Sequence, residues 1–196
     1  MKSLALASLT LALLAAGCGG ARPYRAMAKA ASSEENVFSQ AEDHRLALRV
    51  REAILADDPQ RVVSVTPYAY MAHVYLVGFV NDADEGRRLE SIANSVAGVR
   101  TMDSYLPVRP ASGSTVGDEE LKAKVKAAMA LEPGEVAMRI ETEALAGHVV
   151  LLGVVSSQDA VDSAGARART VVGVKGVTNF LIVPEAEYES LRPHLR

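Results

Sequence analysis

The amino-acid sequence predicts an α+β fold of two tandem small αββαβ modules, each a three-stranded mixed sheet covered on one face by two helices. The first observation is an internal repeat: shifted by 75 positions, the chain matches itself without a gap, Arg45–Val108 falling on Glu120–Val183. Each copy also passes from helical to alternating spacing of apolar residues in the same order. With 49% apolar residues among 196, both copies can bury a small core.

The first helix of each module is predicted from one apolar stripe at helical spacing. The stripe consists of Leu46, Val50, Ala53 and Ile54 in the first copy and of Leu121, Val125, Ala128 and Met129 in the second. The strings DDP and EPG that follow are typical of the end of a helix.

Two strands that pair as a hairpin come next. Alternating apolar residues predict strands at RVVSV and VAMRI, and their partners at HVYLVGFV and HVVLLGVV. Gly147 suits a tight turn, whereas Pro67 and Tyr68 indicate a looser connection in the first copy. Gly78 and Gly153 interrupt the partner strands at the same place. They indicate a helix packed tightly over the strand or a bulge; the alternative is a ligand against bare backbone.

A second helix and a last strand complete each module. The helix runs into a Gly-Val pair, at Gly98 and at Gly173, where glycine adopts the left-handed conformation that ends a helix. The strings SYLPV and NFLIV predict the last strands. Because a helix joins the second and third strands, these strands are expected to be parallel.

The middle strand of each module is apolar on both faces, although two helices can cover only one face of the sheet. Val74 and Leu76 face one side, and Tyr75 and Val77 face the other. An uncovered face this apolar is expected to be buried. The predicted cover lies within the chain, sheet against sheet or sheet against the C-terminal tail; a partner protein is the alternative.

The combined pattern, V…L…I.V…HV.L.G.V……A..V.GV…L.V, resembles the BON domain in both copies, over about two thirds of the chain. The resemblance implies an envelope protein of the DolP or OsmY type, and phospholipid binding has been proposed for the family. His73 and His148 depart from the family pattern, which usually has a small residue there.

The N-terminus resembles a secretory signal that ends in a lipid-attachment site. Lys2 precedes a mostly apolar run from Leu4 to Ala16, shorter than the roughly 20 residues that span a bilayer. The run ends in LAAGC, similar to the bacterial lipoprotein processing site, so Cys18 is the predicted lipid-attachment residue. The alternative is a cleaved signal with an incidental cysteine. Gly19 is not the aspartate that retains lipoproteins in the inner membrane, which favours the outer membrane, facing the periplasm.

These predictions divide the chain into six segments. They are a signal peptide (1–17), a lipidated N-terminus and tether (18–40), a first BON domain (41–108), a linker (109–117), a second BON domain (118–184) and a C-terminal tail (185–196).

Two groups of cations are candidate contacts for lipid headgroups. Arg22, Arg25 and Lys29 follow the predicted anchor in a stretch without acids, and each such charge contributes about 1 kcal/mol near an anionic surface. Lys122 and Lys126 lie one turn apart on the first helix of the second module. The alternatives are a solvated, disordered tether and a solvated helix face.

The residue pattern argues against catalysis, cofactors and nucleic-acid binding. The chain has no phosphate loop or nucleophile elbow, and its single cysteine is the predicted lipid site. The net charge of −3 provides no basic field for nucleic acid. His73 and His148 have no acidic or thiol neighbour at a useful spacing for a metal, so we expect polar residues at strand entrances.

The predicted function is therefore that of a non-enzymatic envelope lipoprotein whose BON domains bind anionic phospholipid and support outer-membrane integrity. The alternatives are a periplasmic scaffold that docks an envelope protein partner, and an OsmY-like stress or chaperone protein without lipid recognition. Salt-sensitive binding to charged liposomes separates the first from the others.

Overall fold

The computed structural model describes residues 22–58, 64–111, 115–130 and 140–184. The chain forms two compact units, Met1–Ser39 and Gln40–Arg196. The second unit contains both copies of the repeat, and the description of side chains begins at Gln40.

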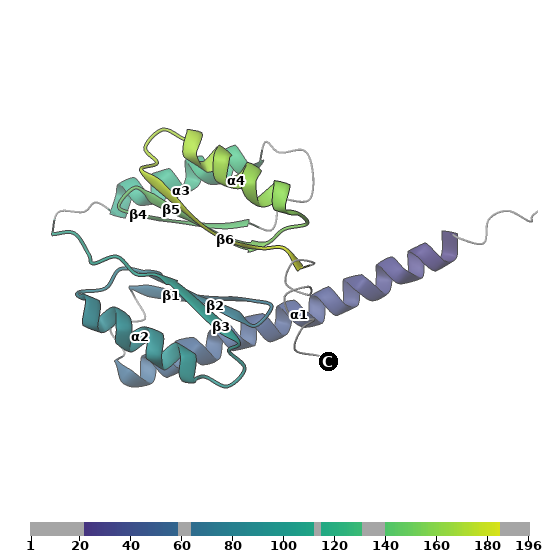
Figure 1. Ribbon diagram of the computed structural model, residues 1–196, viewed down its shortest axis with the longest axis horizontal. Helices are drawn as coiled ribbons and strands as arrows, with labels where there is room; N and C mark the ends of the chain where they lie inside the picture. Colours follow the sequence, from purple (N-terminus) through teal and green to yellow (C-terminus); the bar gives the residue numbers. More distant parts are fainter. Residues whose placement is uncertain (1–21, 59–63, 112–114, 131–139, 185–196) are drawn as a thin grey trace, which may run out of the picture. The chain divides into compact units, whose positions relative to one another are not determined.

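The described helices and strands follow one order twice: helix, strand, strand, helix, strand. They are α1 (Arg22–Asp57), β1 (Val65–Tyr70), β2 (His73–Gly78), α2 (Ala83–Ser95), β3 (Thr101–Tyr105), α3 (Thr115–Ala130), β4 (Ile140–Leu145), β5 (His148–Val154), α4 (Gln158–Thr170) and β6 (Gly176–Ile182). Within each module the two helices lie on the same face of the sheet (Figure 1). The predicted α+β fold class is confirmed.

Each module has a three-stranded mixed sheet with its most apolar strand in the middle. The strand orders are β1-β2-β3 and β4-β5-β6. The first pair in each sheet is antiparallel and the second is parallel. Leu76 of β2 lies between Pro67 and Ser104, and Leu151 of β5 occupies the same place between Thr142 and Asn179.

The hairpin turns differ from the prediction in the first module. The turn there is Met71-Ala72, with φ angles of 54° and 64°, and the equivalent turn is Ala146-Gly147, with 54° and 87°. Positive φ at both central positions suits the twist of a tight hairpin. Pro67 therefore lies inside β1, at the sheet edge where proline is tolerated, and the predicted loose connection there is wrong.

An aspartate on the first helix of each module fixes this turn. The carboxylate of Asp43 accepts hydrogen bonds from the backbone N–H groups of Met71 and Ala72, at 2.8 and 3.0 Å. Asp118 makes the same pair of bonds to the second turn, at 2.8 and 3.0 Å. Hairpin and helix are thus tied together at the same point in both copies.

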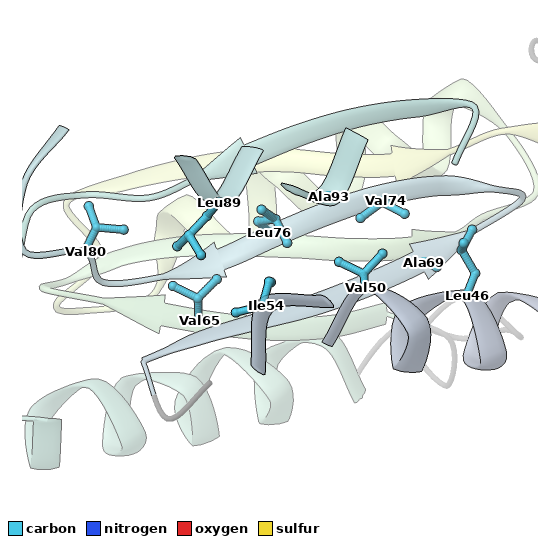
Figure 2. Packing of buried hydrophobic residues seen from close by; sticks show 10 residues of the cluster. All are labelled: Leu46, Val50, Ile54, Val65, Ala69, Val74, Leu76, Val80, Leu89 and Ala93. Carbon is cyan, nitrogen blue, oxygen red and sulfur yellow. The ribbon is translucent and has the colours of Figure 1, made fainter. Parts of the chain in front are cut away.

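The core of each module lies between its helices and its sheet. In the first module α1 supplies Leu46, Val50 and Ile54, which point at β1 and β2, while Leu89 and Ala93 come from α2 (Figure 2). The equivalent core of the second module consists of Leu121, Val125, Met129, Ile140, Ala144, Val149, Leu151, Val155, Ala164 and Ala168. The predicted helix stripes therefore point into these cores, apart from Ala53 and Ala128, which are only partly buried.

The opposite faces of the two sheets share a third apolar cluster. It joins Tyr75 and Val77 of the first module to Val150, Leu152 and Ile182 of the second. The ring of Tyr75 stacks on that of Phe180, with centroids 4.9 Å apart. The predicted burial of the second sheet face is confirmed, and of the covers left open the structure has the sheet of the other module.

Candidate functional site

The lysines of α3 are the described candidates for headgroup contact, and each is bonded to a carboxylate. Lys126 Nζ lies 2.8 Å from Glu141 Oε1, and Lys122 Nζ lies 3.0 Å from both oxygens of Glu143. Lys124, one turn from Glu120, pairs with it at 2.7 Å. Helix α3 lies along the edge strand β4, so its lysines reach the glutamates that alternate on that strand. Much of their charge is thus balanced within the module.

One of these pairs is part of a polar contact between the modules. The Tyr68 hydroxyl of β1 donates a hydrogen bond to Glu143 Oε1 at 2.6 Å, beside the Lys122 ammonium. Burial raises the pKa of Tyr68 well above its usual range, and the bond to Glu143 and the charge of that carboxylate add to the effect. Burial alone lowers the pKa of Lys122, but Glu143 outweighs it and the net shift is upward. Lys122 is therefore held charged at the junction of the modules.

The two histidines lie at the entrances of β2 and β5 and take different neighbours. His148 Nε2 lies 2.9 Å from Thr178 Oγ1, and its ring stacks on Tyr105 of the first module, with centroids 4.4 Å apart. Burial lowers the pKa of His148. His73 Nε2 lies 3.0 Å from the Arg100 guanidinium. Each ring has a structural neighbour, and no three potential metal ligands gather anywhere in the described part of the chain.

The four structural glycines were predicted from strand and helix-end positions. A Cβ atom on Gly78 would overlap the carbonyl oxygen of Ser64 and the backbone of Val65. The close neighbour is thus the backbone that enters β1, not the predicted helix. Gly153, Gly98 and Gly173 have φ angles of 136°, 98° and 102°, which other residues rarely adopt.

The N-terminal candidates lie largely outside the described part of the structure. Cys18 precedes the first described residue. Arg22, Arg25 and Lys29 fall in the first turns of α1, which begins well before the predicted helix, in a segment rich in alanine, the residue with the highest helix propensity. Nothing tests the predicted lipid attachment or the headgroup contacts of these cations. Over the residues that the structure describes, no helix has both the length and the apolar character needed to cross a bilayer.

A different cationic surface was missed by the analysis of single motifs. The chain carries no acidic residue from Ser163 to Pro184, and that stretch contains Arg167, Arg169 and Lys175. These residues lie on the last turns of α4 and in the connection to β6, around the exposed Val172. A charge comparison of the two copies would have found this surface.

Comparison with known proteins places both modules in one family. The BON domain matches residues 42–110 and 117–185. The chain is 28% identical over 157 residues to Osmotically-inducible protein Y of Escherichia coli K12, covering 78% of each protein.

Two solved structures of CdsD, a structural protein of the type III secretion system of Chlamydia trachomatis, are also similar. The first is 12% identical, with a TM-score of 0.31 over 76% of this chain and 69% of that one. The second, a C-terminal domain, is 11% identical, with a TM-score of 0.30 over 67% and 62%. Similarity at this level has no implication for function.

Proposed function

Because the chain belongs to the BON-domain family, with two tandem BON domains, we propose that it is a non-enzymatic envelope protein that binds anionic phospholipid and supports outer-membrane integrity. Cys18 is the lipid-attachment residue in this proposal, and the modules face the periplasm. The signal-like N-terminus supports this location in the cell envelope. The modules add contact with headgroups to the contact made by the anchor.

The observation that carries the proposal is the uneven charge of the second module. The chain has a net charge of −3, yet 163–184 contains three cations and no acid. A cationic surface on an otherwise acidic protein attracts an anionic bilayer over about a Debye length, and each cation at the surface contributes about 1 kcal/mol. The effect falls with salt.

The buried sheet faces also favour a lipid over a protein partner. The large apolar face that would suit protein docking is covered by the other module, through Tyr75, Val77, Val150, Leu152 and Ile182. The exposed large apolar residues of the described chain are separate from that face: Leu48, Leu55, Val108 and Val172. Of these residues, Val172 lies between the exposed cations Arg169 and Lys175 along the chain, which suits an interfacial membrane contact.

Sedimentation with liposomes tests the proposal. All three buried clusters of the described residues lie within Gln40–Arg196, so residues 40–196 keep these clusters and are expected to fold alone. We expect this fragment to pellet with phosphatidylglycerol vesicles at low salt, to pellet less at about 0.15 M salt, and to stay in solution with phosphatidylcholine vesicles. Equal behaviour with both lipids would contradict headgroup recognition.

Similarity to Osmotically-inducible protein Y favours a second candidate, a role in osmotic stress without lipid recognition. In that case the amount of the protein in its native bacterium rises after an osmotic upshift, and the fragment binds neither kind of vesicle. A scaffold role predicts the same lack of vesicle binding, together with a specific envelope protein captured by crosslinking.

A further inference from the structure

We infer that the end of the second module formed by the α4–β6 connection rests on the anionic bilayer, with Val172 entering between the headgroups. The inference rests on the proposed function and names the surface that performs it. Arg167, Arg169 and Lys175 surround this end within the acid-free stretch 163–184. We call residues 167–175 the basic end.

Two of the three cations of the basic end are exposed to solvent, whereas Arg167 is half-buried. Arg169 and Lys175 are exposed, and Lys175 Nζ donates a hydrogen bond to the backbone oxygen of Ala146 at 3.1 Å. Among the described side chains, no carboxylate lies within ion-pair distance of either cation. The lysines of α3, in contrast, each contact a glutamate, so the basic end offers a stronger field to an anionic surface.

Val172 lies between Arg169 and Lys175 along the chain. It is 86% exposed, the highest value among the large apolar side chains described. A single exposed valine needs no explanation. An exposed valine that lies between two exposed cations along the chain, Arg169 and Lys175, suits an interfacial anchor. The apolar group enters the region between headgroups and acyl chains, while the cations contact the phosphates.

The repeat supplies an internal comparison, because the first module has the same connection with different residues. The paired positions are Ile92 and Arg167, Asn94 and Arg169, Ala97 and Val172, and Arg100 and Lys175. The second module has thus gained two cations and a larger apolar tip on an unchanged backbone. Since the fold requires neither change in the first module, the differences indicate a role particular to the second.

The space beside the tip differs as well. In the first module the Arg49 guanidinium reaches the backbone oxygen of Ala97, with Nη2 at 3.4 Å. The equivalent Lys124 turns back to Glu120, and a hollow of about 400 Å³ remains, lined by Val172 and Lys175 and also by the acidic residues Asp118 and Glu120. The lipid phosphates are therefore expected on the exposed cations and not in this hollow.

Charge reversal tests the inference. Residues 40–196 are titrated with phosphatidylglycerol vesicles at about 0.15 M salt, where screening over roughly 8 Å confines the effect to cations at the contact. Lys175→Glu and Arg169→Glu each change the charge by two units, so each should weaken binding by about 30-fold. Both side chains are exposed, so the fold should tolerate the changes, which thermal melting checks.

Arg51→Glu is the matched control. It makes the same change in net charge at an exposed position of α1, on the first module. We expect it to weaken binding by less than about threefold, because its effect reaches the bilayer only through screened, longer-range interaction. An equal loss of vesicle binding in all three variants would overturn the inference, because binding would then depend on the net charge of the protein and not on the basic end.

A fluorescent probe reports the position of the tip directly. The one cysteine of the chain, Cys18, is absent from residues 40–196, so Val172→Cys can be labelled alone with an environment-sensitive dye. Ala97→Cys is the control at the equivalent exposed position of the first module. We expect a blue shift with phosphatidylglycerol vesicles from the dye at 172 and none from the dye at 97.

The outcomes separate the inference from the proposed function. If the parent fragment binds vesicles, while the Lys175 and Arg169 variants bind equally well and the dye at 172 does not shift, the basic end is excluded and lipid binding stands. If the parent fragment binds no vesicles, both fail. If only the Lys175 and Arg169 variants lose vesicle binding, and only the dye at 172 shifts to the blue, both the inference and the proposed function are supported.

Discussion

Leu152→Ala probes the packing of one sheet on the other. Leu152 lies on β5 with no exposed surface, on the sheet face turned away from α3 and α4. Its cluster neighbours include Tyr75 and Val77 of the first module, so the burial of its side chain depends on that module. The substitution should therefore destabilise both modules.

The expected size follows from burial. Removal of three carbon groups at about 0.8 kcal/mol each loses about 2.4 kcal/mol, and the cavity between two hydrogen-bonded sheets raises the cost to about 3–5 kcal/mol. Leu48→Ala, at a helix position that is 45% exposed, should change the free energy of unfolding by less than about 1 kcal/mol.

Urea unfolding of residues 40–196, followed by circular dichroism, measures both free energies. Hydrogen exchange then shows whether the amides of β2 in the first module lose protection in Leu152→Ala. A cost no greater than that of Leu48→Ala, or exchange that changes only in the second module, would refute the packing of the two sheets.

Further changes address single contacts. Thr142 is fully buried and its hydroxyl has no hydrogen-bond partner, so Thr142→Val should raise the free energy of unfolding by about 1–2 kcal/mol in urea titrations; a loss would reveal a bond to that hydroxyl. Gly78→Ala should lower the free energy of unfolding by more than about 2 kcal/mol, because the new methyl group overlaps backbone. Gly86→Ala, inside α2, should raise it by about 0.5–1 kcal/mol, because the nearest atom to its methyl group, in the Val80 side chain, is 4.0 Å away. Equal shifts of the two melting temperatures would contradict this. The lowered pKa of His148 means that its stabilising effect is present above the unfolded value of about 6.5 and is lost as pH falls through the folded value. When the pH falls from about 7 to about 5, the His148→Phe variant should lose less stability than the parent chain. Equal changes in the urea midpoints of the two proteins would count against the lowered pKa of His148.

The element order and the burial of the second sheet face were predictable because each leaves a pattern in the sequence, whereas the sequence left open what covers that face. Because the chain matches itself at a shift of 75 residues, the same order of helices and strands is expected in both copies. Apolar residues on both faces of the middle strand, Tyr75 and Val77 on one and Val74 and Leu76 on the other, indicate a strand that is buried on both faces. Strand bounds were less predictable. Strand β1 (Val65–Tyr70) shares only Val65 with the predicted RVVSV, and residues 61–63, like all of the predicted VAMRI except Ile140, lie outside the described residues.

The hairpin turn and the pairing of the lysines had no local signal. Met71-Ala72 adopts positive φ without a glycine, held by the carboxylate of an aspartate 28 residues earlier. Lys122 meets Glu143 only because α3 lies along β4, and this contact depends on the packed module. Helical spacing indicated that Lys122 and Lys126 share a face, but it could not show that carboxylates meet them there.

Amide NMR spectra of residues 40–196, recorded with and without phosphatidylglycerol nanodiscs, test the central claim most directly. Anionic lipid recognition by the second module predicts shifted or broadened signals concentrated at 167–175 and at neighbouring residues of α3, with the first module's 92–100 unchanged, and no change with phosphatidylcholine. Spectra that are unchanged with both lipids, or changed equally by both, would contradict it.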